Sequence, residues 1–291
     1  MSNIKMNVNM ICNSRQKLWG NLLILCSLFV TCLLAAAGNV EAISDQNTGD
    51  EAQATPLAKV VEFGANYAQW SGDYGNSNAQ FARFTIARPY SYMWRFDAGR
   101  VEMFDDVSFN MGLSYTRYLP DTYSLMIGFS TGTGDIIGDQ YRVNLALGRA
   151  FLERDNLLGT LGYVRAQSKG ENGYDGIEAE LQYYANDNWI FGAFGRYHLG
   201  FPGRTTSLSG GVGVTYQVYR KAYVGAVVEL GEISYMLVGP SNVLEDYRSV
   251  GYKLYVTHYQ TPSAGFNFRL DYERTEFYRL RGIMISLFKE W

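Results

Sequence analysis

Residues 107–116 read VSFNMGLSYT, and their side chains alternate between two kinds. The odd positions hold Val, Phe, Met, Leu and Tyr, whereas the even positions hold Ser, Asn, Gly, Ser and Thr. Successive side chains of a β-strand point to opposite faces, so this period of two predicts a strand with one apolar and one polar face. The period recurs at 123–130, 141–148 and 266–273, which predicts an all-β chain.

The composition narrows the function classes. The 291 residues carry a formal net charge of −3, which excludes a nucleic-acid binder that works through a basic surface. Aromatic residues make up 15% and charged residues only 18% of the chain, which excludes a mostly disordered protein. Long stretches rich in Ala, Leu, Glu and Lys are missing, so a doubly wound enzyme fold is not expected.

The N-terminal residues form a separate segment. Basic residues precede an apolar stretch over 18–37, which ends in Ala-Ala-Ala-Gly. This order predicts a secretory signal peptide over residues 1–37, with a cut after residue 42 or an uncleaved anchor helix as alternatives. All 3 cysteines lie within it. Residues 43–56 are polar and acidic and predict a flexible linker, so the folded domain is expected over 57–291.

Two architectures share the alternating pattern: a soluble sandwich with its apolar faces inside, and a transmembrane barrel with its apolar face outside. Two features favour the barrel. One face of the strands combines Gly and Ser with charges, while the other face is almost free of charge. Aromatic residues also gather near strand ends, where interfacial girdles are expected. These residues are Tyr67, Trp70, Tyr92, Trp94, Tyr115, Tyr118, Trp189 and Tyr216.

Short and longer connections alternate along the chain, as they do in bacterial outer-membrane barrels. We therefore predict an up-and-down antiparallel transmembrane β-barrel of about 14 strands, or of 12 if a weak pair such as 157–167 and its neighbour is misread. An even number places both termini on the periplasmic side. The predicted strands are 57–70, 79–88, 92–104, 107–119, 123–131, 140–151, 157–167, 177–184, 189–198, 206–218, 222–235, 248–259, 264–275 and 279–291.

Closure of the barrel follows from the lipid, which offers no hydrogen-bond partner to an open strand edge. The last strand must therefore pair with the first. It ends on Trp291, and a terminal aromatic after an alternating strand resembles the signal that the barrel-assembly machinery binds. Outer-membrane lipid and lipopolysaccharide are the other expected partners, and no nucleic acid is expected.

The polar face carries charges of both signs, which include Glu62. These charges either pair across the interior and plug it, as Arg95 with Glu178 would, or line a hydrated path. Inward-facing Tyr184, Tyr223 and Tyr255 either stack on sugar rings or fill space. The predicted lumen-lining charges are Arg83, Arg95, Asp97, Arg142, Glu178, Glu180, Arg196, Lys253, Arg269, Asp271 and Glu273.

Catalytic signals are weak. His198 shares the inward face with Ser207 across a hairpin, and Glu180 would complete an acyl-transfer site; a polar lumen lining explains these residues equally. No metal-ligand spacing, phosphate-binding loop or cofactor motif is present in the sequence, so neither a metal nor a cofactor is expected.

The loop after the first predicted strand reads WSGDYGN, that is Trp70, Ser71, Gly72, Asp73, Tyr74, Gly75 and Asn76. It resembles a loop of the YaiO family of outer-membrane β-barrels, and residues 112–118 and 281–287 are similar to strands of that family. The resemblance covers residues 57–291. It implies an outer-membrane location and a link with export of a surface polysaccharide, together with a separate periplasmic export component. It implies no catalytic residues.

Three functions remain open. The first is a channel for a surface saccharide or for small polar solutes. The second is a structural or adhesive barrel with a plugged lumen. The third is an outer-membrane lipid-modifying hydrolase that uses His198.

Overall fold

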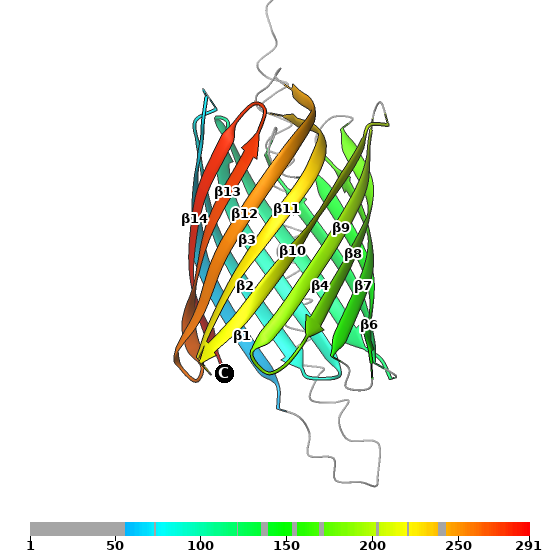
Figure 1. The fold of residues 1–291 in the computed structure, drawn as a ribbon, viewed down its shortest axis with the longest axis vertical. Helices are drawn as coiled ribbons and strands as arrows, with labels where there is room; N and C mark the ends of the chain where they lie inside the picture. The colour runs from blue at the N-terminus through cyan, green and yellow to red at the C-terminus, as the bar shows by residue number, and fades with distance from the viewer. Residues whose placement is uncertain are drawn as a thin grey trace, which may run out of the picture. The chain divides into compact units, whose positions relative to one another are not determined.

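The computed structural model shows one closed barrel of antiparallel strands, in which β1 pairs with β14 (Figure 1). This confirms the predicted fold and the count of 14. The strands are β1 (Ala58–Trp70), β2 (Asn76–Arg88), β3 (Tyr92–Met103), β4 (Asp106–Tyr118), β5 (Tyr123–Gly132), β6 (Tyr141–Phe151), β7 (Leu157–Gln167), β8 (Gly173–Tyr184), β9 (Trp189–Phe201), β10 (Thr206–Tyr219), β11 (Ala222–Leu237), β12 (Val243–Thr261), β13 (Ala264–Thr275) and β14 (Arg279–Glu290).

The structure describes residues 56–291 apart from 73, 121, 135–138, 153–155, 169–171, 202–203, 220 and 238–242, and it describes only the backbone of 219, 233–237 and 243–246. The predicted signal peptide, its alternative cut after residue 42 and the linker up to residue 55 lie outside this part. The described residues include no helix that is long and apolar enough to cross a membrane.

The distribution of apolar side chains distinguishes the barrel from a sandwich. Neighbouring residues of β14 show it: Ser286 points inward and is 1% exposed, while Leu287 points outward and is 64% exposed. Leu161, Val212 and Leu254 are likewise exposed on the outer face. Water would oppose so large an apolar outer surface, whereas a bilayer favours it. The soluble alternative is therefore excluded.

Strand 157–167 is a full member of the barrel. As β7 it pairs along its whole length with β6 and with β8, so the 12-strand alternative is wrong. Three strands begin three or more residues earlier than predicted: β2 at Asn76, β8 at Gly173 and β12 at Val243. The first residues of β8 include Gly173 and Gly176, and the early part of β12 lies beyond the apolar band. Alternation is weak in both segments because no lipid imposes it there.

The connection between β3 and β4 consists of Phe104 and Asp105, one residue earlier than predicted. Both have positive φ angles, 55° and 60°. This geometry matches the right-handed twist of a hairpin but is unfavourable for a bulky residue such as phenylalanine. The Phe104 ring packs against Trp70, with 5.5 Å between ring centroids, and this contact offsets the backbone cost.

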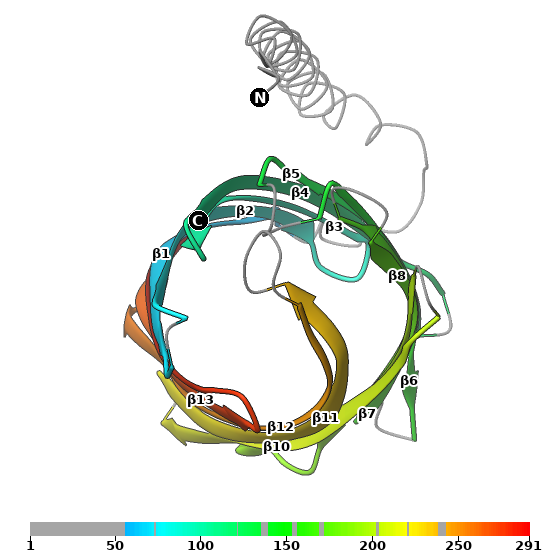
Figure 2. The ribbon, with the colours of Figure 1, turned by 90° about the horizontal axis from the view of Figure 1, so that it is seen from above.

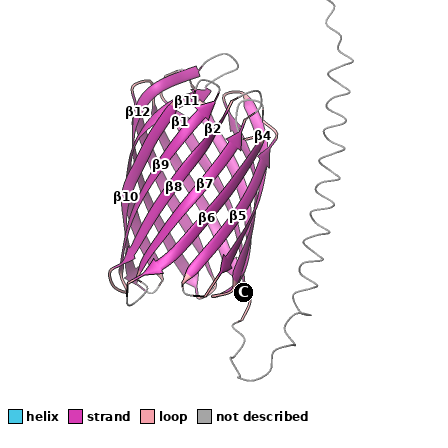
Figure 3. Ribbon diagram, turned by 90° about the vertical axis from the view of Figure 1, so that its right-hand side faces the viewer, coloured by secondary structure: helices cyan, strands magenta, loops and turns pink. Residues whose placement is uncertain are grey.

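The two ends of the barrel differ. The C-terminus and the start of β1 lie at one end, where the turns between strands are short (Figures 1 and 3). At the opposite end, which we call the outer end, the β11–β12 hairpin is the longest, and its end curves inward over the opening (Figure 2). The pairing of these strands continues to Leu237 and Val243.

The two-faced wall makes a direct prediction at adjacent residues of β6. Leu145→Arg places a charge on the lipid-facing surface and should lower the free energy of unfolding by about 2–4 kcal/mol. The matched control Ala146→Arg places the same charge on the inner face and should cost less than half as much. Denaturant unfolding in lipid vesicles, followed by tryptophan fluorescence, measures both. A larger loss in the control would contradict the assignment of the faces.

Candidate functional site

Charged side chains follow the inner wall of the barrel. The strand register places every predicted lumen-lining residue on this face, together with Glu62. They form several separate networks, each between strands that are neighbours or one strand apart.

The first network runs across β1, β2 and β3. Asp97 accepts hydrogen bonds from Arg95 Nε at 2.8 Å and from Arg83 Nε at 2.8 Å. Arg83 also donates from Nη1 to Glu62 Oε2 at 2.8 Å. Two carboxylates and two guanidinium groups therefore alternate along the wall, and each charge has a partner of the opposite sign.

Glu62 extends this network across the junction between the first and last strands. Its Oε1 accepts hydrogen bonds from Asn267 Nδ2 at 2.9 Å and from Ser286 Oγ at 2.5 Å. Glu62 is only 9% exposed, which is low for a carboxylate. Because its partners come from β2, β13 and β14, Glu62 links four consecutive strands around the closure.

The second network centres on Glu229 of β11. Its carboxylate binds Arg196 Nη1 at 2.9 Å and Lys253 Nζ at 2.9 Å. Both cations are among the predicted lumen-lining residues, whereas Glu229 is not. In the described part of the chain Glu229 is the only carboxylate that pairs with them. Glu229 lies an even number of residues after inward-facing Tyr223, and this spacing predicts that Glu229 also faces the lumen.

The third network surrounds His198. His198 Nε2 lies 3.5 Å from Glu178 Oε1, and the imidazole stacks on the Tyr174 ring at 4.7 Å. Arg142 donates to the Tyr174 hydroxyl at 2.9 Å and lies 3.8 Å from Glu178. The histidine is thus held between a carboxylate and an aromatic ring against the wall.

The proposed acyl-transfer residues are only partly brought together. Ser207 is the direct strand partner of His198, but the described structure shows no hydrogen bond between their side chains. The carboxylate beside the histidine is Glu178, whereas Glu180 accepts a hydrogen bond from Gln182 Nε2 at 2.7 Å. No group of three or more His, Cys, Asp or Glu side chains that could hold a metal occurs among the described residues.

An aromatic cluster lies at the outer end of the barrel. Trp70 points inward and packs on Tyr278 with 4.7 Å between ring centroids, so its predicted place in the lipid-facing girdle is wrong. Tyr247 and Tyr278 are 1% and 3% exposed, and the Tyr278 hydroxyl donates to Glu273 Oε1 at 3.0 Å. Burial raises the pKa of Tyr278, which lies in the turn before β14, so this hydroxyl remains a proton donor.

Other predicted girdle residues do face outward. Trp94 packs on Tyr115 at 4.5 Å between ring centroids, and Trp189 packs on Tyr216 at 4.6 Å. Each pair joins directly opposed residues of adjacent strands near the end with short turns. Tyr118, by contrast, has inward parity, because it is the strand partner of inward-facing Ser124.

Inward-facing aromatic rings lie along the wall, over glycines of the neighbouring strand. Tyr255 crosses Gly225 to reach Thr215, with which its hydroxyl shares a hydrogen bond. A Cβ on Gly225 would overlap the Tyr255 ring. Phe194 lies over Gly211 in the same way. Glycine is required at these positions because only a bare backbone lets a ring lie flat instead of projecting into the lumen.

The interior is not cross-linked by its charges. Arg95 pairs with Asp97, and Glu178 pairs with Arg142 and His198, so the two residues that a plugged lumen would join do not meet. Among the described residues no ion pair joins opposite walls. A cavity of about 890 Å³ occupies the outer half of the lumen and is lined from opposite walls, for example by Val101 and Ser209.

No family model matches this sequence, and no curated protein matches it significantly. Solved structures do match. A bacterial polysaccharide outer membrane secretin is similar over 81% of this chain and 99% of its own, at 8% identity and a TM-score of 0.55. The CymD monoaromatic hydrocarbon channel is similar over 80% of this chain and 87% of its own, at 10% identity and a TM-score of 0.54.

Omp33 of Acinetobacter baumannii is similar over 80% of this chain and 99% of its own, at 12% identity and a TM-score of 0.50. At these identities the likeness shows the fold alone, which is that of bacterial outer-membrane β-barrels. The resemblance to the YaiO family stays a prediction.

Glu62 provides a test of the closure network. Glu62→Ala leaves Arg83 without its second carboxylate and removes the acceptor of Asn267 and Ser286, so it should destabilise the barrel by about 3 kcal/mol or more. The control Glu102→Ala breaks an exposed pair with Arg100 and should cost less than about 1 kcal/mol. Reversible unfolding in detergent, followed by the mobility of unboiled samples on a gel, measures both. Equal losses would contradict a special role for Glu62.

Proposed function

We propose that this protein is a passive channel of the outer membrane that conducts polar solutes, with a surface saccharide as its favoured cargo. In this proposal the short turns and both termini are periplasmic, and the outer end with the longer loops faces the exterior.

The arrangement of the inner side chains carries the proposal. Charges pair along the wall, and large rings such as those of Tyr255 and Phe194 lie flat over glycines. A barrel with a filled interior would need neither arrangement, because side chains that project from its wall would pack the lumen. Paired charges of both signs line the lumen with fixed dipoles, which favours the passage of hydrated polar solutes.

A saccharide is favoured over a small ion for two reasons. Tyr184, Tyr223 and Tyr255 present aromatic surface on the inner wall, and such surface suits the apolar faces of sugar rings. The loop motif at Trp70 also resembles the YaiO family, for which a link with polysaccharide export is implied. Export would then need a separate periplasmic component, which would meet the barrel at its short-turn end.

A barrel with an occluded lumen is the second candidate, and one observation favours it. The β11–β12 hairpin curves over the opening (Figure 2), and the buried Tyr247 of β12 belongs to the same aromatic cluster as Tyr278 and the half-buried Trp70. Such a barrel would act as a structural or adhesive element of the surface. The hydrolase has less support, because His198 lacks a hydrogen bond to Ser207 in the described structure.

Single-channel recording separates the two candidates. The refolded barrel in a planar bilayer should show discrete conductance steps, and oligosaccharides should block them reversibly. Steps that ions carry but sugars never block would contradict the saccharide cargo. A folded but silent barrel, judged by its different gel mobility when boiled and unboiled, would contradict the channel and favour the occluded barrel.

Glycine variants connect the conductance to the wall. Gly225→Val should force the Tyr255 ring off the wall into the lumen and lower the unit conductance. Gly192→Val is the matched control, because a Cβ at inward-facing Gly192 meets nothing closer than a backbone oxygen at 3.9 Å. It should change the conductance less. Equal conductance in both variants would show that Tyr255 does not border the conducting path.

A further inference from the structure

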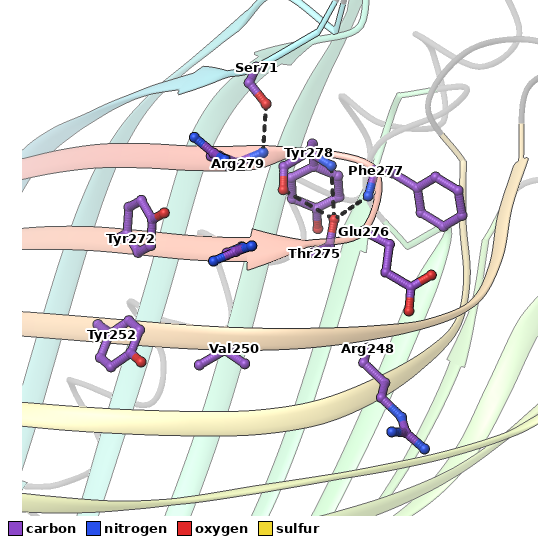
Figure 4. A pocket seen from close by; sticks show the side chains of 11 residues that line it. Ser71, Arg248, Val250, Tyr252, Tyr272, Thr275, Glu276, Phe277, Tyr278 and Arg279 are labelled. Carbon is purple, nitrogen blue, oxygen red and sulfur yellow. Dashed lines mark hydrogen bonds between the residues drawn. The ribbon is translucent and has the colours of Figure 1, made fainter.

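Arginines cluster on the lipid-facing surface at the outer end of β12, β13 and β14. They border a hollow of about 620 Å³ that opens to the outside of the barrel wall (Figure 4). Val250, Tyr252 and Tyr272 form its floor. The outward-facing arginines of this cluster are Arg248, Arg274 and Arg279, with Arg281 two residues further along β14.

Among the described residues, the two central arginines of the cluster have no paired negative charge. Arg274 and Arg279 are directly opposed partners on adjacent strands, an arrangement in which like charges repel. Neither forms an ion pair with any carboxylate in the described part of the chain, although Glu276 borders the same hollow. Arg248 lies 3.6 Å from Glu232, and that contact is highly exposed.

Two other outward-facing arginines near the outer end are paired. Arg100 binds Glu102 at 2.8 Å on β3, and Arg165 lies 3.3 Å from Asp175 between β7 and β8. These two arginines have carboxylate partners, whereas Arg274 and Arg279 have none among the described residues. An uncompensated pair of guanidinium groups on a protein surface is stabilised by an anion that binds there.

The residues below the arginines indicate the kind of anion. Tyr252 and Tyr272 lie next along the strands, with 6.2 Å between ring centroids. Leu254 and Leu270 follow, and they are 56% and 42% exposed on the outer face. The order of cation, aromatic ring and aliphatic chain matches a lipid whose phosphate lies above its acyl chains.

We propose that this flank binds a phosphorylated glycolipid of the outer leaflet, of the lipid A class, through its phosphate. Arg274 and Arg279 hold the phosphate between them, Arg248 and Arg281 border it, and the acyl chains lie against Tyr252, Tyr272 and the leucines below. The inference rests on the proposed orientation of the barrel, since only the outer leaflet presents such a lipid to this end.

Binding of bisphosphorylated lipid A to the whole barrel in a zwitterionic detergent tests the site, with native mass spectrometry as the readout. The double variant Arg274→Gln/Arg279→Gln should weaken binding roughly 25-fold, given a factor of about five for each arginine near an anionic lipid surface. Arg100→Gln/Arg165→Gln removes the same charge from the paired part of the rim and should leave binding within about twofold of the unmodified protein.

Equal weakening by both double variants would overturn the proposal in favour of a nonspecific charge effect. Phosphatidylglycerol that binds as tightly as lipid A, with the same dependence on Arg274 and Arg279, would overturn the choice of a glycolipid. Inorganic phosphate should compete only weakly; full competition at the same concentration would assign the site to a free anion. Gel mobility of unboiled samples verifies that each variant is folded.

A separate measurement tests the orientation of the barrel in the outer membrane. In intact cells a membrane-impermeant maleimide should label Arg204→Cys, at the outer end, and not Asp187→Cys, in a short turn. The reverse pattern would overturn the orientation and hence the lipid assigned to the site. The affinities measured in detergent would still show whether Arg274 and Arg279 form a phosphate site.

Discussion

The junction of β1 with β14 is the contact on which the rest of the barrel depends. Every other pair of neighbouring strands is joined by a short chain segment. In contrast, β1 and β14 are separated in sequence by the whole domain and are held together only by non-covalent contacts. Lys59 and Trp291 exchange hydrogen bonds of 3.0 Å in both directions at one end, and Ser71 N donates to Arg279 O at 2.8 Å at the other. Between them, Glu62 holds four strands together. In lipid an unpaired edge would leave each backbone group unsatisfied, so closure is a condition for insertion.

Closure also explains how the wall divides its roles. Once all backbone groups are paired within the sheet, the outer side chains need only be apolar, and the inner ones are free to carry charge. On the inner face, oppositely charged side chains pair along the wall, and aromatic rings lie flat over glycines. These arrangements pair charges along the wall, and among the described residues no ion pair draws opposite walls together, which is the property that the proposed channel needs.

Sequence alternation predicts the strands and the face of each residue because the period of two is imposed locally, by lipid on one side and water on the other. It does not predict which residues meet. Glu178 and Glu180 have identical parity, yet only Glu178 lies beside His198, because that choice depends on the stagger between β8 and β9. Trp70 shares the parity of inward-facing Glu62, so alternation places it on the inner face; its position at a strand end alone suggested a girdle, and its contact with Tyr278 agrees with the inward orientation.

The loop after β1 takes part in the closure and lies next to both faces of the wall, and these roles account for its composition. Gly72 and Gly75 both have a φ of 74°, which glycine adopts without strain, so the loop can turn tightly back toward β2. Ser71 Oγ accepts a hydrogen bond of 2.7 Å from Arg279 N, which fixes the start of β14. Trp70 faces the lumen against Tyr278, while Arg279 faces the lipid. A single short loop therefore borders the lumen, completes the closure and positions one arginine of the outer cluster. A substitution at Ser71 should thus affect both faces of the wall.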